Sequence, residues 1–186
     1  MVSRSHDLER RAVPRPPRPP LTHRIDRDWI DRARQAVAEH GWFTFARSTS
    51  VATGEPALAY TTGLCCMGRP ELIVTGLPAA IARPVLDTLA KRSLAERLPT
   101  KACLLEGLFA NVDTALMPCE SHRLSEAMPL TFALYADAFD ALQLVWPSQD
   151  GHFPWDESVD PSVKRGQPLL LAPPYDGYRP PLAEVR

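Results

Sequence analysis

The sequence lacks the long apolar runs and the short signature motifs that identify many protein classes directly. No stretch approaches the roughly eighteen consecutive apolar residues that a membrane-spanning helix requires, and the N-terminal region has no apolar segment of the signal-peptide type. The chain also lacks a phosphate-binding glycine loop and the G-x-G-x-x-G, G-x-S-x-G and H-E-x-x-H motifs. The familiar nucleotide-binding, hydrolase and protease signatures are therefore absent, and we expect a soluble, cytoplasmic protein.

Paired cysteine motifs are missing as well. The four cysteines, Cys65, Cys66, Cys103 and Cys119, show no C-x-x-C spacing, and a chain of 186 residues can form a core without disulfides. Free thiols are expected. Cys119 and His122 offer two kinds of metal ligand at close spacing, but no second spaced pair completes a zinc pattern. The sequence therefore predicts neither a metal site nor a cofactor.

Charge is distributed unevenly along the chain. Residues 1–24 carry six arginines against two acidic residues, a net charge of +4, which leaves −5 for the remainder because the whole chain carries −1. Within this segment, residues 12–20 contain five prolines and show no apolar periodicity, so we predict a disordered tail. The alternative is a proline-rich docking peptide or a basic contact for an acidic partner. The acidic body argues against a nucleic-acid-binding surface.

Helical and strand-like patterns fill the rest of the chain. A helix is expected near residue 26, where Asp26 can cap it and Gly41 can end it. A helix over about 79–98 is expected to become regular only near Pro84. The other predicted elements are strands at 42–48, 57–64, 71–77, 102–110, 111–118 and 141–146, and a helix at 130–139. This pattern predicts a single α+β domain over residues 25–186, with a mostly antiparallel sheet and helices packed on one face.

Two separated motifs carry a family resemblance. They consist of Tyr60, Thr61, Gly63 and Leu64, Pro70 to Leu72, Gly76 to Pro78, Gln143, Trp146 and Pro147, Asp150 and Gly151, and Phe153 to Trp155. In these residues the chain resembles the bacterial family known as domain of unknown function 4262, over about residues 26–156. The resemblance implies no established activity and no catalytic residues. Residues 157–186, with one apolar run, are predicted to form an edge strand or a strap.

The sequence departs from the family pattern at three places. Thr62 stands where an aliphatic residue is expected, and Ser148 stands where an aspartate often follows the Trp-Pro pair, although Asp150 is close by. The adjacent Cys65 and Cys66 are not a feature of the pattern. Any role of the missing aspartate is therefore in doubt for this chain.

Two side chains are the candidate catalytic groups. Glu71 precedes an apolar strand and suits a general base or a substrate clamp, whereas its ordinary alternative is a solvated or salt-bridged charge at a strand start. His152 suits acid-base chemistry near neutral pH, and its ordinary alternative is a loop histidine bonded to backbone. A weaker hypothesis pairs Cys65 or Cys66 with His152 as nucleophile and base.

Hydroxyl, aromatic and acidic side chains near the two motifs are the candidate ligand-binding groups. They are Tyr60, Thr61, Thr62, Trp146, Asp150 and Trp155. Because side chains alternate along a strand, Thr61 is expected to face opposite its two neighbours.

Two functions remain open at this point. The first is a small-molecule site, binding or catalytic, between the loops at 60–72 and 146–156, where Glu71 and His152 would converge. The alternative is a protein-interaction module that uses an aromatic corner of Trp146, Phe153 and Trp155. The first requires the two loops to meet, and the second requires an exposed tryptophan.

Overall fold

The computed structural model describes residues 25–109 and 112–171 and the backbone of 183–185. The predicted tail at 1–24 lies outside the described residues. The first element is helix α1 (Arg27–His40), whose N-cap Asp26 accepts a hydrogen bond from the Asp28 backbone N–H and whose end is set by Gly41 at φ +91°. Both ends of the helix agree with the prediction. Gly41 can end it because glycine adopts the left-handed conformation without strain.

The expected antiparallel meander follows α1. Its strands are β1 (Phe43–Arg47), β2 (Leu58–Thr62) and β3 (Glu71–Thr75), with a short 3-10 helix η1 (Leu64–Met67) between β2 and β3. Trp29 of α1 packs its ring against the rings of Phe43 and Phe45 at 6.2 and 5.2 Å between centroids. Aromatic burial therefore fixes α1 against β1.

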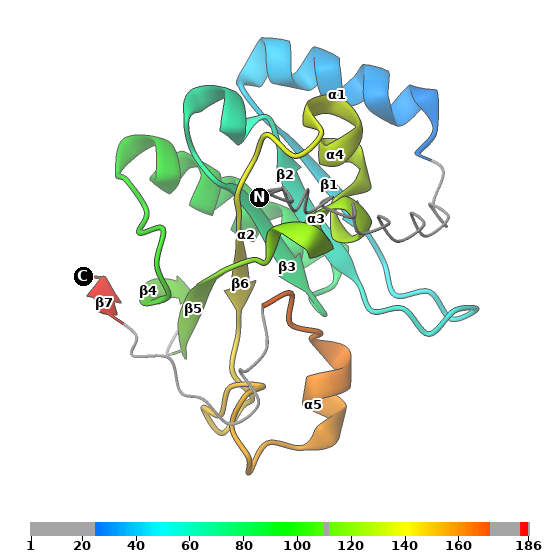
Figure 1. Ribbon diagram of the computed structural model, residues 1–186. Helices are drawn as coiled ribbons and strands as arrows, with labels where there is room; N and C mark the ends of the chain where they lie inside the picture. Colours follow the sequence, from blue (N-terminus) through cyan, green and yellow to red (C-terminus); the bar gives the residue numbers. More distant parts are fainter. Residues whose placement is uncertain (1–24, 110–111, 172–182, 186) are drawn as a thin grey trace, which may run out of the picture.

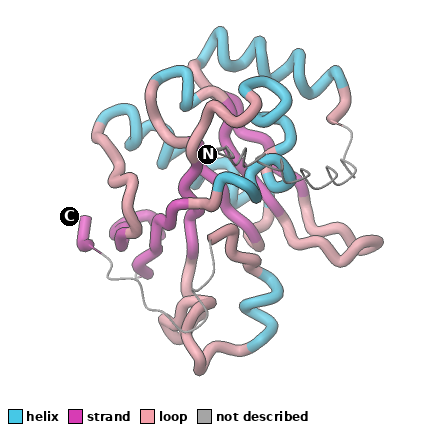
Figure 2. The backbone as a smooth tube through the Cα atoms, in the orientation of Figure 1, coloured by secondary structure: helices cyan, strands magenta, loops and turns pink. Residues whose placement is uncertain are grey.

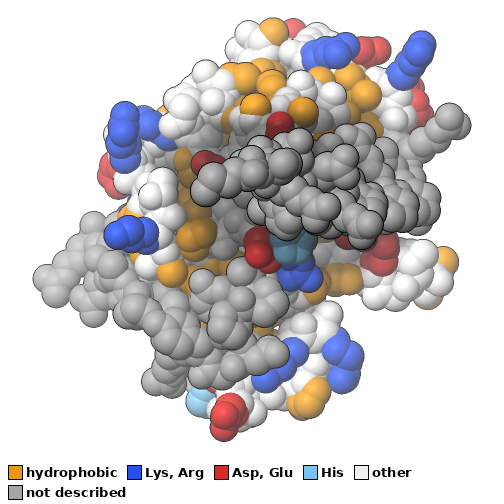
Figure 3. All heavy atoms as spheres, in the orientation of Figure 1, with side chains coloured by type: hydrophobic (Ala, Val, Ile, Leu, Met, Phe, Trp, Pro, Cys, Tyr) orange, Lys and Arg blue, Asp and Glu red, His pale blue; other side chains and the backbone are white. Residues whose placement is uncertain are grey.

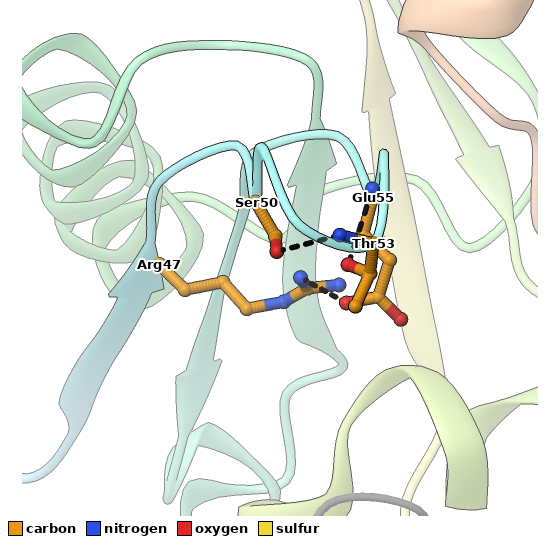
Figure 4. A network of polar contacts seen from close by, with 4 residues as sticks. All are labelled: Arg47, Ser50, Thr53 and Glu55. Carbon is orange, nitrogen blue, oxygen red and sulfur yellow. Dashed lines mark hydrogen bonds and ion pairs between the residues drawn. The ribbon is translucent and has the colours of Figure 1, made fainter.

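Polar contacts order the turn between β1 and β2 (Figure 4). The Arg47 guanidinium lies 2.8 Å from the Glu55 carboxylate, and the Ser50 hydroxyl accepts a hydrogen bond from the Thr53 backbone N–H. The Thr53 hydroxyl accepts in turn from the Glu55 backbone N–H. Two hydroxyl side chains thus accept from backbone N–H groups of the turn, and the ion pair between Arg47 and Glu55 joins its two ends.

The second half of the domain extends the sheet. Its elements are α2 (Ala79–Ala95), β4 (Cys103–Phe109), β5 (Val112–Pro118), α3 (Ser121–Ala127), α4 (Pro129–Tyr135), β6 (Ala141–Val145), α5 (Pro161–Gly166) and β7 (Ala183–Val185). The strand order is β1-β2-β3-β6-β5-β4-β7, and only β3/β6 and β4/β7 pair in parallel. The α+β class and the mostly antiparallel sheet are confirmed.

The parallel pair in the middle of the sheet decides where the candidate loops lie. Strand β6 inserts between β3 and β5, and Glu71 at the start of β3 is the register partner of Ala141 at the start of β6. Both strands therefore begin at the end of the sheet near η1 and α4 and run toward the end where α5 lies (Figure 1). Figure 2 shows that the segment following β6 is mostly loop.

Helices cover both faces of the sheet, which differs from the prediction of one covered face. Helix α2 packs with alternate strand residues such as Leu72 and Leu142, whereas α1, α3 and α4 pack with residues of the opposite face such as Tyr60 and Ile73. The reason is that β2, β3 and β6 are buried along their whole length. Strands buried on both sides need apolar cover on both sides.

Three further details differ from the sequence prediction. Helix α2 begins at Ala79 and contains Pro84 in its second turn, so the proline does not mark its start. The short helices α3 and α5 were not predicted, because seven and six residues give too little periodicity to recognise. The expected helix at 130–139 ends at Tyr135.

The segment at 167–171, called the strap below, is held against β6 by side-chain hydrogen bonds; it lies in the region 157–186 that was predicted to form an edge strand or a strap. The Gln143 side chain donates to the Pro168 carbonyl and accepts from the Leu170 backbone N–H, at 2.9 and 2.8 Å. The Gln167 side chain makes the same kind of paired contact with the backbone of Trp146. Two buried glutamines thereby replace the strand partners that the strap lacks.

On the face shown in Figure 3, the described surface carries charged side chains of both signs in several separate places. Among the described residues, no helix is long and apolar enough to cross a membrane.

Candidate functional site

Glu71 is the central group of the candidate site, and it is completely buried. One carboxylate oxygen, Oε1, accepts from the backbone N–H groups of Gly63 and Cys65 at 2.7 and 3.0 Å, and Oε2 accepts from the Thr61 hydroxyl at 2.7 Å. The carboxylate therefore holds the segment that enters η1. The solvated charge that we weighed as the alternative for Glu71 is excluded by this burial.

Burial and hydrogen bonding act in opposite directions on Glu71. Desolvation raises the pKa of its carboxyl above the ordinary value, and the donors from Thr61, Cys65 and Gly63 lower it by a smaller amount. A carboxyl of raised pKa binds a proton more readily near neutral pH than an exposed one. This property suits a proton acceptor for a neighbouring acid.

The three hydroxyls that were predicted to bind ligand are all buried and paired within the protein. The Tyr60 hydroxyl accepts from the Leu130 backbone N–H, and the Thr62 hydroxyl lies 2.7 Å from that of Thr131. The Thr61 hydroxyl donates to Glu71 and accepts from the Leu72 backbone N–H. These three side chains lie in the protein interior, where they cannot contact a ligand that binds at the surface.

Two thiols and a phenol extend the site from Glu71 to the surface. Cys65 is partly exposed, Cys66 is exposed, and Tyr135 at the end of α4 is partly exposed. The charges of Glu71 and Cys66 raise the pKa of the Cys65 thiol, and those of Cys66, Cys65 and Glu71 raise the pKa of the Tyr135 hydroxyl. Four ionisable groups thus lie close together between solvent and a buried carboxylate.

The thiol of Cys65 is held in its protonated form. Burial raises its pKa most, and the charge and hydrogen bond of Glu71 raise it further. A thiol of this kind is a weak nucleophile until its proton is removed, because the thiolate is the reactive species. The Glu71 carboxylate, which accepts from the Cys65 backbone N–H, is a proton acceptor in the same cluster.

His152 does not join this cluster, which corrects the prediction of a shared site. Because β3 and β6 are parallel, Glu71 lies at the start of β3 while His152 follows the far end of β6. A five-residue strand alone spans about 16 Å. His152 instead lies 3.8 Å from the Asp156 carboxylate, within its own loop. The hypothesis of a cysteine paired with His152 is wrong for the same reason.

The aromatic corner belongs to the hydrophobic core. Trp155 is 6% exposed and stacks on Phe153 at 4.6 Å between ring centroids, and the Trp146 indole N–H donates to the Thr75 carbonyl. The interaction-module alternative required Trp146 or Trp155 to be exposed, whereas Trp155 is buried and Trp146 is partly buried. Asp150, a candidate ligand-binding residue, is exposed at the turn of this loop, away from Glu71.

Tyr135 and Thr131 are the site residues that sequence reasoning missed. Both lie in α4, some seventy positions after the threonines of β2, and Thr131 contacts Thr61 and Thr62. The local sequence indicated only a buried helix, since nothing in it shows which strand end that helix covers. In the described part of the chain, no group of three or more His, Cys, Asp or Glu side chains is arranged to hold a metal ion.

Comparison with known proteins gives the chain's family. Residues 36–160, more than half of the chain, match the family described as Domain of unknown function (DUF4262). No curated protein and no solved structure matches the chain. The matched range contains both motifs and every side chain of the Glu71 cluster. The chain belongs to the domain of unknown function 4262 family.

Proposed function

We propose that the domain acts on a small electrophilic molecule at the sheet end formed by β2, η1 and β3, with Cys65 as the nucleophile and Glu71 as its base. The observation that carries this proposal is the 3.0 Å hydrogen bond from the Cys65 backbone N–H to the buried Glu71 carboxylate, whose charge also raises the pKa of the Cys65 thiol. A nucleophile and a base within hydrogen-bond reach are the minimum that covalent catalysis requires. The raised pKa of Glu71 supports the assignment, because a stronger base takes a thiol proton more readily.

The backbone around Cys65 supports the same role. Gly63 adopts φ +114°, and a Cβ at this position would lie 2.7 Å from a Val37 methyl and 2.9 Å from the Gly41 carbonyl. The turn is therefore closed against α1, and Cys65 is placed by backbone contacts on both sides. A nucleophile held in one position loses little entropy on reaching its transition state.

Alkylation by iodoacetamide tests the proposal, because this small uncharged electrophile reports the reactivity of each thiol. The background is Cys66→Ser, in which peptide mass spectrometry reads Cys65 alone on its tryptic fragment. If Glu71 is the base, Glu71→Gln slows alkylation of Cys65 at pH 7 by about tenfold or more. If Glu71 is only a neighbouring charge, removing it lowers the pKa of Cys65 and alkylation becomes faster, which would refute the proposal.

Two controls accompany this measurement. Glu39→Gln removes an exposed carboxylate of α1 and leaves the Cys65 rate unchanged. Cys119, whose pKa burial raises to about 12 and which has no carboxylate among the causes of its shift, serves as the reference thiol within each sample. If Glu71→Gln changes the alkylation rate of Cys119, the fold has opened generally. An equal change in the alkylation rate of Cys65 would then contradict a specific role of Glu71.

A further inference from the structure

Residues 131–140, which lead from α4 into β6, are fixed to the two strand ends that the η1 loop joins. The η1 loop is the connection between β2 and β3. At the end of β2, the Thr131 hydroxyl lies 2.7 Å from the Thr62 hydroxyl. At the start of β3, the Asp140 carbonyl accepts from the Glu71 backbone N–H at 2.8 Å. Hydrogen bonds at both ends thus place this segment at the same edge of the sheet as the η1 loop.

Tyr135 lies near the middle of this segment, on the side of the sheet to which Cys65 belongs. It follows Thr131 by four residues, about one helical turn, so both side chains project from the same face of α4. In the η1 loop, Leu64 packs with α2, whereas Cys65 packs with the core cluster of the opposite face, which Tyr135 also contacts. Both side chains are partly exposed. The phenol and the thiol therefore reach solvent on the same face and at the same end of the sheet.

The chain turns sharply directly after Tyr135, at a strained residue. Ala136 has φ +53° and ψ −125°, and in the described part of the chain no other residue except glycine has a positive φ. The Ala138 backbone N–H closes the turn on the Tyr135 carbonyl at 3.1 Å. Glycine is usual at this position of a tight turn, so the alanine is held there by its surroundings. The strained turn fixes the end of α4 from which Tyr135 projects.

We propose that Tyr135 donates a hydrogen bond to the carbonyl oxygen of the electrophile that Cys65 attacks, and that the site takes α,β-unsaturated carbonyl compounds. This inference rests on the proposed function, because it names the substrate class of the same nucleophile. Addition to such a compound has no leaving group and needs one proton acceptor and one hydrogen-bond donor, which Glu71 and Tyr135 supply. Acyl transfer would also need a group that activates water, and His152 lies at the other end of the sheet.

The addition step balances without an oxidant or a reductant. The Cys65 sulfur forms a bond to the β-carbon of the substrate, and the π electron pair of the carbon–carbon double bond moves toward the carbonyl oxygen to give an enolate. Tyr135 donates to that oxygen, where the charge develops. Its hydroxyl stays protonated because burial and the charges of Cys66, Cys65 and Glu71 raise its pKa. The proton that Glu71 takes from the thiol passes to the α-carbon, which gives a thioether and restores Glu71.

Acrylamide and iodoacetamide test this inference as a pair, because both are small amides that alkylate thiols. Addition to acrylamide places charge on the amide oxygen, whereas displacement of iodide does not. In the Cys66→Ser background, peptide mass spectrometry reads both adducts of Cys65. Tyr135→Phe, which removes only the hydroxyl, should lower the ratio of the acrylamide rate to the iodoacetamide rate at Cys65 by about tenfold or more. The same ratio at Cys119, measured in the same samples, is the reference.

Two outcomes would overturn the inference. One is an unchanged ratio at Cys65 in Tyr135→Phe, whether the two rates stay the same or fall together, because the phenol then makes no contact specific to the substrate oxygen. The other is a wild-type ratio at Cys65 no higher than that at Cys119. Glu71→Gln separates either result from failure of the proposed function. If the iodoacetamide rate of Cys65 still depends on Glu71, only the role of Tyr135 and the substrate class are removed; if it does not, the proposed function fails.

Discussion

Replacing Glu71 with alanine should destabilise the domain by about 3 kcal/mol. The change removes the acceptor of two buried backbone N–H groups, those of Gly63 and Cys65, and of the Thr61 hydroxyl. Each buried donor left without a partner costs about 1–3 kcal/mol. The relief from no longer burying a carboxylate offsets part of this sum.

Glu71→Gln is the matched control for that prediction. Its amide oxygen keeps both N–H contacts, while its amide nitrogen meets the Thr61 hydroxyl, which already accepts from Leu72. A cost of about 1 kcal/mol is expected. Urea unfolding followed by circular dichroism measures both variants, with an unchanged slope as the condition for comparing them. An alanine variant within about 0.5 kcal/mol of wild type would show that Glu71 does not hold the turn.

Three further predictions concern stability. Trp155→Ala should cost about 3 kcal/mol or more, because it truncates a core indole that is 6% exposed, and a loss below about 1 kcal/mol in urea unfolding would place Trp155 outside the core. Gly76→Ala should cost about 3 kcal/mol, because Gly76 has φ +80° and a Cβ there would lie 2.4 Å from the Gly166 carbonyl oxygen; an unchanged melting temperature would contradict this contact. Deleting residues 1–24 should leave the melting temperature nearly unchanged, since this segment has too little apolar surface to offset its ordering entropy, and a loss of several degrees would show that it packs on the domain.

Local signals in the sequence predicted most of the fold. Asp26 and Gly41 marked the limits of the first helix, and alternating or β-branched runs located six of the strands. The sheet order was not predictable, because nothing in the segment at 141–146 indicates that it inserts beside β3. That parallel pairing decides which loops share an end of the sheet.

The candidate site was predicted in part. Glu71 was identified from its place before an apolar strand, and the structure makes it the buried centre of a cluster. His152 was assigned to the same site because both loops follow strands, but they follow strands at opposite ends. Cys65 was paired with His152 in one hypothesis, and its contact with Glu71 was not predicted, because that contact depends on how the 3-10 turn folds back.

The pKa of the Glu71 carboxyl in the folded protein distinguishes a base from a structural anchor. Carbon-13 NMR of glutamate-labelled protein, with Glu71→Gln to assign the resonance, follows this single group from acid to neutral pH. Since burial raises the pKa, the Glu71 contribution to stability is fully present below the ordinary value of 4.5 and is lost as the pH rises through the raised value. We expect a titration midpoint clearly above 4.5, and we expect the alkylation rate of Cys65 to change over the same pH range. A midpoint at or below 4.5 would make Glu71 a structural anchor of the turn and would contradict its role as a base.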